Sequence, residues 1–186
     1  MATFGKTDHS GNDDDWNTGQ IIVSKFALPV DGDISKLTAR FSNGDAGRKV
    51  IGCIYSDNAG VPNLLQGETN EVTGISDNWL DLPFAVDLHL HAADFWLGYM
   101  CDGFYQYDYA AVAGQQKIDN VVYPNFSSPF VVEIQRDREI SIYATYTPSG
   151  GVTPKRMLMG VGLMAKTQKF EARKVVPWKC PLPLYK

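Results

Sequence analysis

The sequence predicts an all-β protein, built as an antiparallel sandwich or barrel and followed by an extended C-terminal arm. Between residues 20 and 148, short runs rich in β-branched and aromatic residues are separated by turn residues, and helical periodicity is almost absent. The separating segments, such as Pro29–Gly32 and Asp57–Gly60, contain residues that preset a turn or accept a positive φ. The charge also changes sign near Pro148. We therefore expect a domain over residues 1–148 and an arm over residues 149–186.

Each apolar run gives one expected strand. The expected strands span residues 20–28, 34–42, 49–56, 71–75, 79–82, 95–101, 104–112, 117–122, 130–134 and 140–147. Because turn residues lie between the runs, we expect short antiparallel connections.

Alternation within the runs indicates which side chains point inward. In the run 34–41 the apolar residues are mostly two positions apart, with one slip after Ile34 that a β-bulge would absorb. The residues expected to face the core are Ile34, Leu37, Ala39 and Phe41, and those expected to face solvent are Lys36, Thr38 and Arg40. In the runs 49–55 and 95–101 both parities are apolar, which indicates strands covered on both faces, either inside the sandwich or by a neighbouring subunit. We expect Trp79 and Trp96 to be core residues.

The charge distribution favours an interaction protein over an enzyme. Residues 1–148 hold 9 Lys and Arg against 20 Asp and Glu, a net charge of −11, whereas residues 149–186 hold 8 against 1, a net charge of +7. A block of residues with like charge usually contacts a partner surface of opposite charge. An acidic protein surface, on another copy of the chain or on a capsid shell, fits the arm. We do not expect direct binding of nucleic acid, because the acidic body repels phosphate and the arm has no stacking pattern.

The arm has the composition of a partner-binding segment. Residues 155–165 form a Met-rich apolar stretch framed by cations, and three prolines in the last ten residues favour an extended course. The residues expected to contact a partner are Lys155, Arg156, Met157, Met159, Met164, Lys169, Phe170, Arg173, Lys174 and Trp178. The alternative is that residues 156–165 form a final strand of the body, and both can hold.

Length and cysteine content indicate a protein that is stable without disulfide bonds or structural metal ions. A domain of about 150 residues buries enough apolar surface to fold without metals or disulfides. Cys53, Cys101 and Cys180 are odd in number and follow no repeated spacing, which argues against a disulfide framework, although a Cys53–Cys101 bridge stays open. We expect no signal peptide, and no window approaches the roughly 20 apolar residues of a membrane span.

Several segments of the body resemble a jelly-roll-like β-sandwich module that recurs in bacteriophage virion proteins and bacterial surface proteins. The resemblance rests on residues 2–7, 24–28, 32–39, 49–62, 79–84, 95–98 and 140–146, and it covers about residues 1–148. It implies a jelly-roll-like sandwich without assigned catalysis, in phages typically a decoration protein, fibre or tail appendage. These segments are specific for fold and weak for function, because one fold hosts many activities.

Two groups of side chains in the body are candidate binding sites. Asp87, His89 and His91 share one face of a strand, and two imidazoles spaced by one residue can chelate a transition metal, although a third ligand must come from elsewhere. The alternative is a solvent-facing polar side. Tyr105, Tyr107 and Tyr109 also share one face, which predicts a saccharide platform, a subunit contact or ordinary core packing.

The acidic N-terminal run gives a weaker metal candidate. Asp13–Asp15, with Asp8 and Asn12, could form a loose Ca²⁺ site, but the spacing of an EF-hand loop is missing, and a solvated acidic loop is the alternative.

The sequence lacks several common catalytic and cofactor-binding motifs. It has neither a Gly-x-Ser-x-Gly elbow nor a phosphate loop, and no Cys-x-x-Cys motif. We therefore predict no catalytic residues and no cofactor.

These observations lead to one leading hypothesis and two alternatives. The leading one is a non-enzymatic virion structural protein, a capsid decoration or head/tail accessory protein, made in the host cytoplasm and forming homo-oligomers or contacts with other virion proteins through the arm. The second is a carbohydrate-binding module of a phage adhesin or bacterial surface protein. The third is a cupin-like metal-dependent enzyme using His89 and His91.

Overall fold

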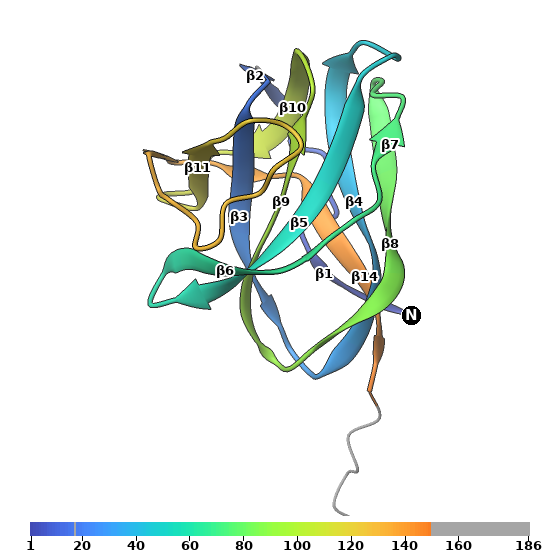
Figure 1. Ribbon diagram of the computed structural model, residues 1–186, viewed down its shortest axis with the longest axis vertical. Coiled ribbons are helices and arrows are strands. Elements are labelled where there is room, and N and C mark those ends of the chain that lie inside the picture. Colours follow the sequence, from blue (N-terminus) through green and yellow to red (C-terminus); the bar gives the residue numbers. More distant parts are fainter. Residues whose placement is uncertain (17, 150–186) are drawn as a thin grey trace, which may run out of the picture. The chain divides into compact units, whose positions relative to one another are not determined.

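The structure, a computed structural model, describes residues 1–16 and 18–149, and these fold into two antiparallel sheets (Figure 1). No helix occurs among the described residues, so none that could cross a membrane is found there. The ten residues expected to contact a partner and the alternative final strand, 156–165, lie outside the described residues.

The first sheet has the order β1-β14-β4-β10-β13, with β2 paired to β10 and β8 paired to β4. Its strands are β1 (Ala2–Gly5), β2 (Asn12–Trp16), β4 (Gly32–Gly44), β8 (Asn78–Leu90), β10 (Tyr105–Ala110), β13 (Glu139–Ile140) and β14 (Ile142–Pro148).

The second sheet has the order β12-β11-β3-β9-β5-β6, with β7 paired to β5. Its strands are β3 (Gln20–Leu28), β5 (Lys49–Asn58), β6 (Val61–Glu68), β7 (Val72–Thr73), β9 (Ala93–Cys101), β11 (Gln116–Asn120) and β12 (Ile134–Arg136). The predicted all-β sandwich is thereby confirmed.

Strand β4 follows the predicted alternation. Leu37, Ala39 and Phe41 are fully buried in the core between the sheets, as is Ile34. The register of β4 against β8 shifts between Ile34 and Lys36, where the sequence predicted a bulge. Because side chains alternate between faces, the even-numbered positions from 36 to 42 point away from this core.

The second sheet is covered on both faces, as the two-sided apolar runs predicted. Leu97 and Tyr99 of β9 face the core between the sheets. Trp96 and Met100 face a second apolar cluster, over which the segment after β11 folds (gold in Figure 1). Phe130 from this segment packs edge-on against Tyr55, with ring centroids 5.0 Å apart. The cover of this face is therefore a loop of the same chain.

Several expectations about local structure are wrong. Strands β1, β2 and β6 were not predicted, and residues 130–133 form no strand although one was expected there. The acidic run is a strand, not a loop, because β2 pairs along its whole length with β10. Trp79 is only half-buried, since its position on β8 faces away from the core, whereas Trp96 is buried as predicted.

Cys53 and Cys101 are both free and buried. They point to opposite faces of the second sheet, Cys53 into the second cluster and Cys101 into the main core, which explains why they form no bridge. Burial raises the pKa of both thiols well above the usual range. Neither thiol is suited to act as a nucleophile.

Candidate functional site

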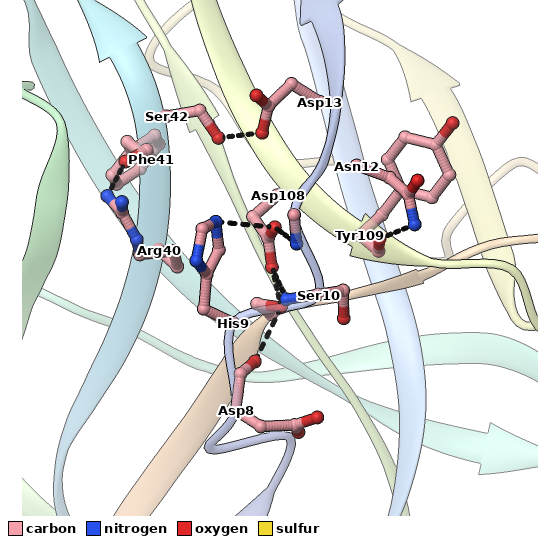
Figure 2. A network of polar contacts seen from close by, with 12 residues as sticks. Asp8, His9, Ser10, Asn12, Asp13, Arg40, Phe41, Ser42, Asp108 and Tyr109 are labelled. Atoms are coloured by element: carbon pink, nitrogen blue, oxygen red, sulfur yellow. Dashed lines mark hydrogen bonds and ion pairs between the residues drawn. The ribbon is translucent and has the colours of Figure 1, made fainter.

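A network of polar contacts surrounds Asp108 on β10 (Figure 2). Its carboxylate is fully buried, although it points to the outer face of the first sheet. It accepts hydrogen bonds from the backbone amides of Ser10 (2.9 Å) and Gly11 (2.8 Å) and from the hydroxyl of Ser141. The Nε2 atom of His9 lies 3.1 Å from the same carboxylate. Asp108 therefore fastens the N-terminal segment across the sheet.

The same segment is tied at further points. The hydroxyl oxygen of Ser141 also lies 3.1 Å from the backbone oxygen of Asp8, and the amide of Ser141 donates to the backbone oxygen of Asp108. The side chain of Asn12 donates to the backbone oxygen of Tyr109. A buried carboxylate is stable only when it is hydrogen-bonded, and residues 8–12 supply most of the donors.

One group in this network has the composition of a metal site. The ligand atoms of His9, Asp13 and Asp108 lie within 4.8 Å of one another, and His9 and Asp13 are exposed. One imidazole nitrogen and two carboxylate oxygens suit Zn²⁺ or Mn²⁺ better than Ca²⁺, which prefers oxygen alone. Asp13 already accepts a hydrogen bond from Ser42, and Asp108 has its own donors. The network is therefore complete as a structural anchor without an ion.

The predicted Ca²⁺ cluster is split by the strand geometry. Asp13 lies beside His9 and Asp108, whereas Asp15 accepts a hydrogen bond from Gln106 at 2.6 Å. Asp8 pairs with Lys6 at 2.8 Å. Neighbouring residues of a strand point to opposite faces, so Asp14 cannot join Asp13 in one site.

Asp14 belongs to a separate ionic network at the end of the sandwich. It pairs with Arg136 at 2.6 Å and also with Arg138. Partial burial raises the pKa of Asp14, but the hydrogen bond and charge of Arg138 and the charge of Arg136 outweigh this, so the pKa lies below its usual value. The arginines also stack on rings: Arg138 lies 4.3 Å from the centre of Tyr109 and Arg136 5.2 Å from that of Trp16.

The tyrosines of β10 share one face as predicted, but that face is the core. Tyr105 and Tyr107 are fully buried, and the rings form a row with centroids 6.5 Å and 5.9 Å apart. Tyr109 is half-buried, and Arg138 occupies one side of its ring. A saccharide cannot stack on Tyr105 or Tyr107, because the sheets enclose both rings.

A different aromatic pair lies on the outer face of the first sheet. Trp79 on β8 and Tyr143 on β14, here called the outer aromatic pair, have ring centroids 5.4 Å apart, tilted by 58°. Both are half-buried and flank Thr38, which is buried although alternation predicted it to face solvent. Asp81 beside the pair binds Thr38 at 2.7 Å and Lys36 at 2.6 Å, and Arg40 pairs with Asp77 at 2.5 Å. This surface was not predicted from the sequence, because Trp79 was expected in the core and Tyr143 comes from a distant strand.

His89 and His91 lie at the end of β8 and just after it, and both are exposed. The structure brings Asp33 to within 2.6 Å of His89 and Asp31 to within 3.0 Å of His91. Asp87, the third residue named with them, is also exposed. These side chains therefore lie on a polar side of the strand end that faces solvent, where both interpretations of the sequence, a metal site and a solvated polar face, stay open.

The fold defines the chain as a β-sandwich protein. Comparison of the sequence with protein families gave no match, and comparison with curated proteins gave none either.

Two solved structures share the fold. One is the clostridial cysteine protease Cwp84 after propeptide cleavage, with a TM-score of 0.57, 11% identity, and coverage of 78% of this chain and 40% of that one. The other contains the cysteine protease and lectin-like domains of Cwp84, described as a surface layer associated protein of Clostridium difficile, with a TM-score of 0.51, 10% identity, and coverage of 75% and 37%. This chain spans about two fifths of each of them. At this level of identity the likeness shows the fold alone.

Proposed function

We propose that the chain is a non-enzymatic structural protein of a bacteriophage virion, a capsid decoration or head/tail accessory protein that is anchored through residues 149–186. The observation that supports this most directly is the contrast between the acidic body, net −11 over residues 1–148, and the basic remainder, net +7. Opposite charges on one chain favour ordered association with further copies or with an acidic shell.

The position of the last described strand supports this division. Strand β14 pairs with β4 as far as Pro148, and the amide of Ser149 donates to the backbone oxygen of Asp31 at 2.9 Å. The basic residues begin at Lys155, so a chain ending at Ser149 keeps every described strand and removes the whole basic segment.

The test compares the full chain with a chain ending at Ser149 by light scattering and thermal melting. We expect a defined oligomer for the full chain and a folded monomer with a similar melting temperature for the shorter one. High salt should weaken the association, because the screening length for exposed charges falls from about 8 Å at physiological salt to about 3 Å at 1 M. A full chain with serine at Met157, Met159, Met164, Phe170 and Trp178 should behave like the shorter one.

Two outcomes would count against the proposal. An unfolded shorter chain would show that residues 150–186 complete the body. If both chains are monomers and neither co-sediments with capsids, the residues beyond Ser149 anchor nothing in a virion.

A second function, carbohydrate binding on a phage adhesin or bacterial surface, is favoured by the outer aromatic pair. Trp79 and Tyr143 present half-buried rings at an angle, with the carboxylate of Asp81 and the guanidinium of Arg40 beside them. Aromatic faces flanked by hydrogen-bonding groups are a common arrangement for sugar rings. The lectin-like domain named for Cwp84 has its place in a surface layer associated protein, which fits this alternative.

We expect Trp79→Ala and Tyr143→Ala each to abolish retention on a glycan array if this second function is right. The melting temperature should fall only slightly, because both rings are partly exposed already. Phe104→Ala is the matched control, since Phe104 is an exposed aromatic residue, 46% accessible, that is not part of the pair. Equal retention by all three variants would exclude the outer aromatic pair as a glycan site.

A further inference from the structure

His89 and His91 form a pair of imidazoles whose orientation is fixed by carboxylates. The Nδ1 atom of His89 lies 2.6 Å from Oδ1 of Asp33, and the Nδ1 atom of His91 lies 3.0 Å from Oδ2 of Asp31. A carboxylate can only accept hydrogen bonds, so each Nδ1 carries the proton and donates it. In the neutral ring this leaves the lone pair on Nε2, one of the two ring atoms through which histidine binds metals.

The two carboxylates are themselves held in place. Asp33 is the direct cross-strand partner of His89 in the pairing of β4 with β8. Asp31 precedes β4, and its Oδ1 accepts the amide of Ala92 at 2.8 Å. Asp31 thus accepts both the imidazole N–H of His91 and the backbone amide of Ala92. Carboxylates that orient histidine in this way are characteristic partners of metal-binding imidazoles.

The rings are close together and accessible. Their centroids lie 5.2 Å apart with the planes at 90°. The side chain of His89 is 51% exposed and that of His91 is 82% exposed. A hydrated ion can therefore reach both rings without any rearrangement of the sandwich.

We propose that His89 and His91 form a binding site for a divalent transition metal ion, with Nε2 of each ring as ligand and with Asp33 and Asp31 as positioning residues. Imidazole favours Zn²⁺, Ni²⁺ and Cu²⁺ over Ca²⁺ and Mg²⁺, and for a given site the affinity rises from Ni²⁺ to Cu²⁺ and falls again at Zn²⁺. Water completes the coordination, because the described residues place no third protein ligand in the same cluster.

This site differs chemically from the group around Asp108. His9 offers one nitrogen beside two carboxylates that are already hydrogen-bonded, whereas the proposed site offers two nitrogens. The chain contains three histidines, so single substitutions separate the two sites completely.

The test is calorimetric titration with NiCl₂ of the full chain carrying Cys180→Ser, which removes one competing thiol ligand. We expect the parent to bind one Ni²⁺ ion. His89→Ala and His91→Ala should each bind Ni²⁺ at least tenfold more weakly than the parent. Asp33→Asn should weaken binding by about tenfold, as loss of an orienting carboxylate does in other sites. The electron paramagnetic resonance spectrum of the Cu²⁺-loaded chain should show nitrogen couplings, which His91→Ala reduces.

The matched control is His9→Ala, which should bind Ni²⁺ like its parent. Melting temperatures of all variants should stay close together, because His89 and His91 are exposed. The proposal is overturned if His89→Ala and His91→Ala bind as tightly as the parent, if His9→Ala alone loses binding, or if the parent binds no Ni²⁺.

Discussion

Asp108→Ala is expected to lower the free energy of unfolding by about 3–5 kcal/mol, which chemical denaturation would measure. The substitution leaves the amides of Ser10 and Gly11 without their acceptor, while the hydroxyl of Ser141 keeps only the backbone oxygen of Asp8. Each buried donor that loses its partner costs about 1–3 kcal/mol, and water entering beside the half-exposed His9 offsets part of the sum.

The loss should be local as well as global. Hydrogen exchange of the Ser10 and Gly11 amides should become fast in Asp108→Ala, since these amides then face water. Asp108→Asn should be intermediate, because its amide keeps one acceptor oxygen but places an NH₂ group against a donor.

Asp13→Ala is the matched control for Asp108→Ala. Asp13 is the direct cross-strand partner of Asp108, but it is exposed, and Ser42 is its hydrogen-bond partner. We expect a change of less than about 1 kcal/mol. If Asp108→Ala were as mild as Asp13→Ala, the N-terminal segment would not depend on the buried carboxylate.

Among the Gly→Ala substitutions in the described part of the chain, Gly98→Ala is expected to destabilise the fold most. It should lower the free energy of unfolding by about 4 kcal/mol or more. A Cβ atom at Gly98 would lie 1.9 Å from the backbone oxygen of Ile22 and 2.5 Å from Cγ1 of Val23. Strand β9 is paired on both sides, with β3 and β5, so the backbone cannot move away without breaking a ladder.

Gly47→Ala provides the same chemical change at a tolerant position. Its Cβ atom would meet only the Oδ1 atom of Asp45, at 3.4 Å, in an exposed turn. We expect a change within roughly 0.5 kcal/mol. Urea denaturation and the soluble yield of both variants give the comparison, and a soluble Gly98→Ala chain of parental stability would contradict the tight pairing of β9 with β3.

Most of the expected strands are present in the structure. The run 20–28 is strand β3 with the same bounds, and the inward residues of β4 are those that alternation indicated. The missed strands carry weak local signals. Strand β2 is acidic except for Trp16, and β6 contains Pro62, which belongs at a sheet edge, where β6 indeed lies.

For the candidate sites, too, the sequence predicted local features but not their surroundings. The sequence showed that Tyr105, Tyr107 and Tyr109 share a face and that His89 and His91 share another, because both follow from a period of two. It did not show which face is enclosed, and the tyrosines turned out to face the core while the histidines face solvent.

By itself, then, the sequence determined the all-β class, the strand alternation of the body and the charge contrast between residues 1–148 and 149–186, because these depend on neighbouring residues only. Tertiary structure alone decided which distant residues meet. Asp108 meets Ser10 across 98 positions, and His89 meets Asp33 across 56. Trp79 pairs with Tyr143 through the order of the strands in the first sheet. Such contacts depend on sheet order and register, which the whole core fixes and which no local pattern encodes.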